Sequence, residues 1–248
     1  MLDRLKTILS NSLSDPEVDI EGETVPVRIR RTAQARRISM RADVVRREIR
    51  ITMPPYSPTS AAMDFVAQKT QWIAARLHSG PAAAPLRPGG TVAFEGEPYQ
   101  IVWNPSATRT VKLLEGPEGR ELHLGGPEDM VEARIIRWLK SEARRVFADD
   151  ISHYCGVAGA RSPRLSMGDP RSRWGSCSSR GTISLSWRLI MAPAHVRRSV
   201  IAHEVAHIRH MDHSRAFYCW LDEIYEGDRK AADRWLKMHG VALQRVGR

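Results

Sequence analysis

Hydrophobic and polar residues alternate along the first part of the chain, in the pattern of strands that are buried on one face. The alternation is clearest in three segments between residues 25 and 55: VPVRIRRT, RRISMRAD and REIRITMPP. Val, Ile and Met occupy alternate positions there, as is typical of half-buried strands. Two further pairs of strands are predicted at 91–103 and 110–126, each around a turn that contains glycine.

A helical period replaces this alternation elsewhere in the chain. After Pro58, the residues from 59 to 77 predict one helix, and its apolar face holds Met63, Val66, Ile73 and Leu77. Apolar residues recur at helical spacing in four later segments, 128–155, 196–208, 215–225 and 227–240. Two strands are predicted between the first two of these helices, at 164–169 and 182–191.

These elements predict an α+β fold with a β-rich N-terminal half and a helical C-terminal half. We expect an N-terminal tail over residues 1–20, a β-rich region over 21–125 and a helical domain over 126–248. The Pro/Gly/Ala stretch at 79–90 has the length of a surface loop inside one domain. A chain of 248 residues is long enough to bury one large core or two modest ones.

The segment HEVAH, from His203 to His207, carries the clearest chemical pattern in the sequence. On a helix, two histidines four residues apart share one face and lie about 6 Å apart along the axis. Neutral imidazoles at this spacing can bind one zinc ion, and Glu204 is placed to take a proton from a zinc-bound water. The alternative is a core helix with satisfied histidines, and the further histidines downstream count against it.

A catalytic zinc site needs a third protein ligand, and two histidines compete for this place. His210 shares the face of the HEVAH pair, but it lies about 10.5 Å along a straight helix from His203. His213 can reach the ion only if the chain turns near Asp212, a residue type that accepts turn conformations. Ser214 would then be the N-cap of the next helix. We therefore predict His213 as the third ligand and keep His210 as the alternative.

The composition adds a strong basic imbalance. The formal net charge is +10 and the pI is near 10.1, which favours acidic partners and nucleic acid first. Arg30, Arg31, Arg36 and Arg37 concentrate charge near the start of the chain and are the candidate docking residues. No recognisable nucleic-acid-binding module accompanies them, so a chain that is basic by composition alone is an equal interpretation.

The three cysteines, Cys155, Cys177 and Cys219, are odd in number and widely spaced. This spacing argues against a disulfide framework and against a cysteine zinc site. No apolar run approaches the length of a membrane span, and the first residues do not form a secretory signal. We therefore expect a cytoplasmic protein without a membrane partner, and the sequence does not indicate its oligomeric state.

Two segments, HEVAHIRHMDHSRAF and RSRWGSCSSRGTISLSWRLIMAP, resemble the YgjP-like metallopeptidase family of zincins, which are related to SprT and WLM. The likeness extends to IRRTAQARRISMR, ITMPP and KMHG. It implies a gluzincin-like fold, Glu204 as the catalytic glutamate, and zinc bound by His203, His207 and His213. It also implies that Thr182 to Ile190 forms the strand that binds substrate. Neither the resemblance nor the residues assign a role to the segment RWGS at 173–176.

We therefore expect a zinc metalloendopeptidase of the HExxH type that binds one zinc ion. A metal-activated water would hydrolyse peptide bonds of protein or peptide substrates, with Glu204 as general base. Tyr218 and His210 are the nearest candidates for an additional group that stabilises the oxyanion. The alternative is a basic, nucleic-acid-associated protein whose zinc is structural or weakly catalytic, acting on proteins bound to DNA.

Overall fold

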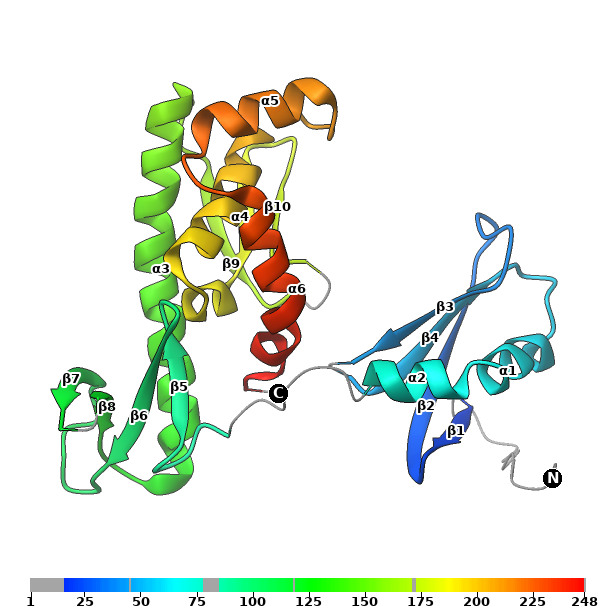
Figure 1. Ribbon diagram of the computed structural model, residues 1–248, viewed down its shortest axis with the longest axis horizontal. Coiled ribbons are helices and arrows are strands. Elements are labelled where there is room, and N and C mark those ends of the chain that lie inside the picture. Colours follow the sequence, from blue (N-terminus) through cyan, green and yellow to red (C-terminus); the bar gives the residue numbers. More distant parts are fainter. Residues whose placement is uncertain (1–15, 45, 78–84, 118, 171–172, 248) are drawn as a thin grey trace. The chain divides into compact units, whose positions relative to one another are not determined.

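The chain forms two compact units in the computed structural model, each with its own hydrophobic core (Figure 1). The structure describes residues 16–44, 46–77, 85–117, 119–170 and 173–247. Unit 1 comprises Met1–Gly80 and unit 2 comprises Pro81–Arg248. The Pro/Gly/Ala stretch therefore contains the division between the units, whereas the sequence suggested a loop within one domain. The boundary expected near residue 125 falls inside unit 2, because the strands before it share the core of the helices after it.

Unit 1 contains a four-stranded sheet. Its strands are β1 Glu17–Ile20, β2 Glu23–Arg31, β3 Ser39–Asp43 and β4 Glu48–Met53. Their order is β1-β2-β4-β3, with β2 parallel to β4 and the other neighbours antiparallel. The residues of β1 were expected in the tail, but they pair with β2 because Val18 and Ile20 join the core. The short helix expected before Pro16 lies outside the described residues.

Two short helices, α1 Thr59–Ala67 and α2 Thr70–Leu77, cover one face of this sheet. The hydrophobic period predicted one continuous helix here. The break coincides with a hydrogen bond of 2.7 Å, in which the Thr70 hydroxyl donates to the Ala67 carbonyl. Such local side-chain bonds compete with the helical pattern. The predicted packing face is nevertheless kept in part, since Val66, Ile73 and Leu77 are buried.

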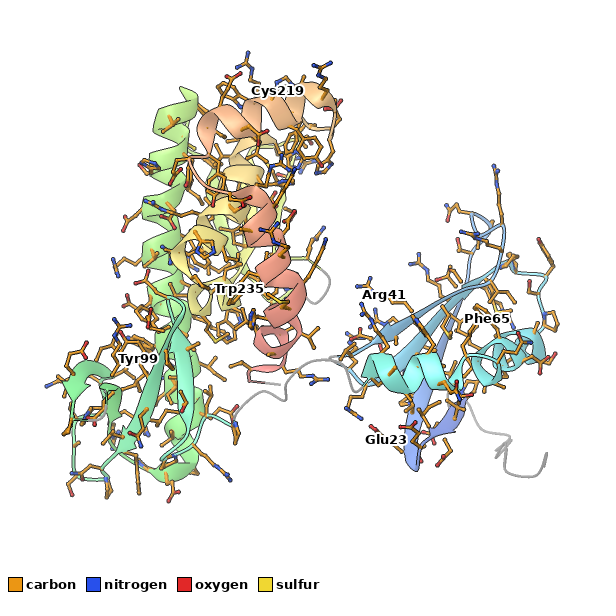
Figure 2. The ribbon with its side chains drawn as sticks, viewed as in Figure 1. Glu23, Arg41, Phe65, Tyr99, Cys219 and Trp235 are labelled. Atoms are coloured by element: carbon orange, nitrogen blue, oxygen red, sulfur yellow. The ribbon has the colours of Figure 1, made fainter. Side chains whose placement is uncertain are left out.

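Unit 2 begins with a second four-stranded sheet. Its strands are β5 Thr91–Phe94, β6 Glu97–Trp103, β7 Lys112–Gly116 and β8 Gly119–Leu124, in the order β5-β6-β8-β7. Glu95 and Gly96 join β5 to β6 with positive φ angles of 51° and 89°, as a tight hairpin turn demands. Tyr99, labelled in Figure 2, meets Phe94 edge-on with ring centroids 6.1 Å apart. The sheet lies beside the first turns of the next helix (Figure 1).

This next helix, α3 Val131–Ala158, follows the short 3-10 helix η1 Glu128–Met130 and runs along the core of unit 2. Its buried residues recur at helical spacing, for example Val131, Ile135 and Leu139. The helix ends at Gly159, whose φ of 60° lies in the left-handed region that favours glycine. One helix therefore contacts both the second sheet and the later helices.

A three-stranded sheet and three helices complete unit 2. The strands are β9 Arg164–Gly168, β10 Gly175–Cys177 and β11 Thr182–Ser186, in the order β10-β11-β9. The helical elements are η2 Trp187–Met191, α4 Ala194–Ala206, α5 Arg215–Ile224 and α6 Arg229–Arg245. The strand predicted over 182–191 thus stops at Ser186, and its apolar continuation becomes the 3-10 helix η2, which packs on α3.

Sheets and helices together confirm the α+β class that the hydrophobic pattern predicts. Helices are present in both units, so they are not confined to the C-terminal half. Within the described part of the chain, no helix has the length and the apolar character needed to cross a membrane.

Candidate metal centre

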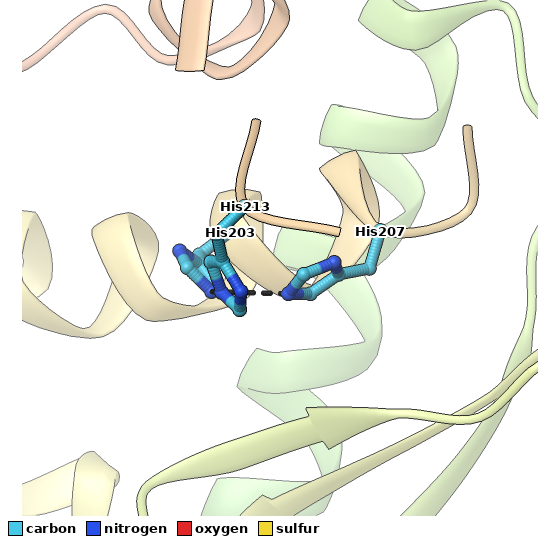
Figure 3. A group of neighbouring side chains, drawn as sticks. All are labelled: His203, His207 and His213. Carbon is cyan, nitrogen blue, oxygen red and sulfur yellow. Dashed lines mark hydrogen bonds between the residues drawn. The ribbon is translucent and has the colours of Figure 1, made fainter. Parts of the chain in front are cut away.

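Three histidine side chains converge at the end of α4 (Figure 3). The Nε2 atoms of His203 and His213 are 3.1 Å apart, and those of His203 and His207 are 3.2 Å apart. His203 belongs to the last turn of α4, His207 directly follows this helix, and His213 precedes α5. The structure therefore brings together the three histidines that the sequence predicts as ligands.

The turn between α4 and α5 places His213. Oδ1 of Asp212 accepts a hydrogen bond from the backbone N–H of Ser214 at 3.3 Å. Oγ of Ser214 accepts one from the N–H of Phe217 at 3.4 Å, as the N-cap of α5. The first bond closes the turn after α4 and the second begins α5. The side chain of His213, which lies between them in the chain, is therefore directed back to α4.

His210, the alternative third ligand, lies outside the cluster. The helix α4 ends at Ala206, earlier than its hydrophobic period suggests, so His210 is no longer on the helical face. Its backbone carbonyl instead lies 2.9 Å from Nδ1 of His207. A carbonyl can only accept, so Nδ1 donates and Nε2 keeps a free lone pair. His210 thus orients one member of the cluster.

The neutral imidazole is the favoured form of His203. Burial, together with the neighbouring His207 and His213, lowers the pKa of His203 from 6.5 to about 4. The buried ring of Phe217 lies under all three imidazoles, with centroid distances of 4.9, 4.5 and 5.0 Å to His203, His207 and His213. Neutral histidine is the form that binds metal ions. In the sequence, Phe217 is one of the apolar residues at helical spacing in 215–225. Its place below the rings depends on the turn and cannot be predicted from that spacing.

The arrangement fits a zinc ion. Nitrogen ligands lie about 2.0–2.1 Å from tetrahedral zinc, and hence roughly 3.3–3.4 Å from one another. The separations of 3.1 and 3.2 Å from His203 come within a few tenths of an ångström of that value, and all three ligand atoms lie within 4.8 Å of one another. A search of the His, Cys, Asp and Glu side chains in the described residues finds these three histidines close enough to share an ion. Three ligands leave one tetrahedral position for water.

Glu204 lies on α4 beside the first histidine and is only 5% exposed. Burial raises its pKa from 4.5 to about 7, although the charge of Arg173 and a hydrogen bond from the Cys177 backbone oppose this rise. The Oε2 atom is buried and has no hydrogen-bond partner among the described residues. A carboxylate with an unused oxygen can take a proton from a water beside it.

The backbone of β10 lies directly against this carboxylate. A Cβ atom at Gly175 would be 2.6 Å from Oε1 of Glu204, a distance that real Cβ contacts do not show. The preceding Trp174 packs on α6, where a Cβ atom at Gly240 would be 3.0 Å from the indole. The segment at 173–176 therefore connects α6 to Glu204. A glycine inside a strand signals such a close approach, but only the fold identifies what approaches it.

Ion pairs fix α4 within unit 2. Arg197, which is 4% exposed, donates to Asp150 of α3 at 2.7 Å and to Glu95 at 2.8 Å. Arg198 donates to Asp150 at 3.2 Å and to Glu226 at 3.2 Å. Buried charges are tolerated when they are paired and hydrogen-bonded. This network holds the helix that carries the HEVAH segment against α3.

The strand order corrects one expectation about substrate. The prediction that Thr182 to Ile190 binds an extended substrate is wrong, because β11 is already paired with β10 on one edge and with β9 on the other. The open edge beside α4 belongs to β10. The Trp174 carbonyl and the Ser178 N–H bond to the β11 side. In an antiparallel pair, Gly175 and Cys177 then direct their backbone groups to the other side.

The two candidates for an oxyanion-stabilising group differ in position. The Tyr218 ring centroid lies 6.3 Å from that of His213, and the guanidinium of Arg229 lies 4.9 Å above the Tyr218 ring. His210 faces the cluster with a carbonyl oxygen, which repels negative charge. Tyr218 is therefore the candidate that the structure keeps beside the site.

A buried carboxylate beside clustered imidazoles defines a candidate metal-dependent hydrolytic site in an α+β protein. A family model described as YgjP-like, metallopeptidase domain, matches residues 37–239. The chain belongs to this family and carries its metallopeptidase domain. Among solved structures, it is similar to the metallopeptidase zymogen of Pyrococcus abyssi abylysin, with 22% identity, a TM-score of 0.34, and coverage of 37% of this chain and 92% of that chain. A comparison with curated proteins finds no match.

Proposed function

We propose that this protein is a zinc-dependent endopeptidase of the zincin type, with one zinc ion bound by His203, His207 and His213. The observation that carries the proposal is the convergence of three Nε2 atoms beside a buried glutamate on the same helix. A closed structural zinc site normally uses four protein ligands, often cysteines. The three-histidine set with an open position favours catalysis over a structural role.

The side chains have separate roles in this proposal. Zinc, when bound, supplies Lewis-acid polarisation of the scissile carbonyl and of a water. Glu204 takes the proton of that water at Oε2 and delivers it to the nitrogen of the leaving amine. In the metal-free protein the pKa of Glu204 is about 7, raised by burial. A carboxyl group that titrates near neutral pH can both accept a proton and release it. Tyr218 is the proposed oxyanion-stabilising group.

The substrate would extend along β10. A peptide can add as a strand to an unpaired edge, where main-chain hydrogen bonds align it. Gly175 and Cys177 direct backbone groups toward that edge, and the Cys177 backbone already bonds to Glu204. A peptide bonded to Gly175 would therefore lie beside the proposed base. The unpaired thiols of Cys155, Cys177 and Cys219 support a reducing, cytoplasmic setting.

Metal analysis of two histidine variants tests the ligand set. Removing a ligand abolishes tight binding, whereas residues around the ligands typically contribute about 10–100-fold to affinity or activity. We expect purified His213→Ala to lose its zinc and His210→Ala to keep about one zinc per chain. His210→Ala is a suitable control, because the bond to His207 comes from the His210 backbone and survives the exchange. Zinc retention in His213→Ala together with loss in His210→Ala would make His210 the third ligand.

A further inference from the structure

Arginines form a row across the sheet of unit 1. In the strand register, Arg28 on β2 lies opposite Arg50 on β4, and Arg50 lies opposite Arg41 on β3. The neighbouring row begins with Arg30 on β2. Successive residues of a strand point to opposite faces, and the residues between these arginines, such as Ile49, belong to the core under α1 and α2. The arginines therefore occupy the face that the helices leave uncovered; Figure 2 labels Arg41 on β3.

Acidic side chains neutralise only part of this charge. Glu48 bonds to Arg50 at 2.7 Å and lies 3.5 Å from Arg28. Burial acts to raise the pKa of Glu48, but hydrogen bonds from neighbouring arginines outweigh burial and lower it. Arg30 and Arg41 are exposed, and neither forms an ion pair with any residue that the structure describes. Two guanidinium groups thus remain available on the same face.

The face is also hollowed. The charged residues in its lining are five arginines and one glutamate, namely Arg28, Arg30, Arg41, Arg46, Arg50 and Glu48, and the other lining residues are uncharged. Like charges placed directly opposite in a sheet are destabilising. Glu48 and Asp43 offset this repulsion at Arg50, and Glu48 offsets it at Arg28, so a bound polyanion would relieve the part that remains at Arg41. Guanidinium groups match phosphate geometry with two parallel hydrogen bonds.

We propose that this arginine face of unit 1 binds the phosphate backbone of duplex nucleic acid without sequence preference. Three strands at a spacing of about 4.8 Å spread the row over roughly 10 Å. Duplex DNA carries roughly one charge per 1.7 Å of its axis, so the row can contact several phosphates at once. The site goes beyond the proposed peptidase activity, which unit 2 carries.

The residues around the hollow decide between possible anionic partners. None of the side chains that line it is aromatic, so the face lacks the stacking platform that single-stranded binding uses. The exposed aromatic residues described in unit 1, Tyr56 and Trp72, lie outside the lining, which leaves the hollow without an aromatic anchor for a membrane interface. The arginines of this face also differ from the docking residues expected from the sequence. Arg31 was one of those, but its guanidinium donates to Ser57 and Thr59 and does not line the hollow.

Fluorescence anisotropy of the full chain with a labelled duplex of random sequence tests the proposal. Affinity should fall with salt, because each neutralised phosphate contributes about 0.9 to the slope of log K against log salt concentration. We expect Arg30→Gln/Arg41→Gln to reduce this slope by about 2 and to weaken binding at least about tenfold at low salt. Two duplexes of unrelated sequence should bind within about twofold of each other.

The matched control is Arg137→Gln/Arg144→Gln, which removes the same charge from exposed positions of α3 in unit 2. It should bind as the wild type does. Equal losses in the two double variants would attribute binding to net charge and overturn the proposal. Absence of duplex binding by the wild type, or tighter binding to vesicles of anionic lipid or to polyglutamate, would also overturn it. Arg41→Gln alone, which breaks no ion pair among the described residues, should lower the slope by about 1.

Discussion

The two units of this chain use arginine in opposite ways. In unit 2, Arg197 is buried and bonded to Asp150 and Glu95, so acidic partners neutralise its charge inside the fold. In unit 1, Arg30 and Arg41 project from a sheet face without an acidic partner in the described part of the chain. The net charge of +10 therefore says little by itself. Its effect depends on whether each arginine positions a helix or remains available to a partner.

The largest expected effect breaks the buried network of unit 2. Asp150→Asn leaves the Arg197 guanidinium buried with less compensation, and loss of one partner of a buried pair costs about 3–5 kcal/mol. Urea unfolding followed by tryptophan fluorescence measures the free energy of unfolding. In unit 1 the matched exchange is Glu23→Gln, which removes a half-exposed partner of Arg47 and should cost under about 1 kcal/mol. Similar costs in the two variants would remove the contrast between the units.

A second prediction concerns the pH dependence of the metal-free protein. The folded-state pKa of Glu204, about 7, lies above its unfolded value of 4.5. The lowered pKa of His203 has the opposite effect on stability, equally in the wild type and in Glu204→Gln. For Glu204, the folded state binds the extra proton between pH 4.5 and 7, so the contribution of this group to wild-type stability falls as pH rises over this interval. The loss is about 3 kcal/mol at 1.36 kcal/mol per pKa unit. Glu204→Gln lacks this group, so its stability relative to wild type should rise over the same interval. A pH-independent difference would refute the shifted pKa.

The third prediction sharpens the contact between β10 and Glu204. Gly175→Ala places a methyl group 2.6 Å from Oε1, so the carboxylate must move. A displacement of about 1 Å at a catalytic group can reduce the rate about 100-fold. We expect a fall in kcat of about 10–100-fold with zinc retained. Gly168→Ala, where the nearest atom would be 3.4 Å away, is the control in the same sheet. Equal kcat values for the two variants would show that the contact does not position Glu204.

The smallest expected effect lies in unit 1. Arg41→Gln removes one member of the cross-strand row, and relief of like-charge repulsion should stabilise the protein by about 0.2–1 kcal/mol. The gain should shrink at high salt, because exposed charges are screened. Thermal unfolding at low and high salt measures it. A destabilised variant would mean that Arg41 stabilises the folded sheet, which contradicts the expected like-charge repulsion.

The sequence predicts those parts of the site that depend on local geometry. The histidine pair of HEVAH, the turn at Asp212 and the cap at Ser214 follow from helical spacing and from residue preferences, and the structure places His213 accordingly. The α+β class follows in the same way from the two hydrophobic periods. These features involve residues that are near one another in the chain.

The remaining features depend on contacts between distant segments. The central position of β11 follows from the pairing of β9, β10 and β11, which no hydrophobic pattern encodes. The approach of Gly175 to Glu204 requires the packing of β10 on α4. The division of the chain within 79–90 depends on which core the later strands join. The alternation pattern shows that a strand has a buried face, but not what covers it.

The central claim is that Glu204 moves protons at a metal held by the three histidines. Its most direct test is the zinc content and the peptide hydrolysis of Glu204→Gln measured beside the wild type. The claim predicts about one zinc per chain in both proteins and a loss of hydrolysis of about 10²–10⁴-fold in the variant, the usual contribution of general acid–base catalysis. A variant that loses its zinc, or one that hydrolyses peptide at the wild-type rate, would contradict it.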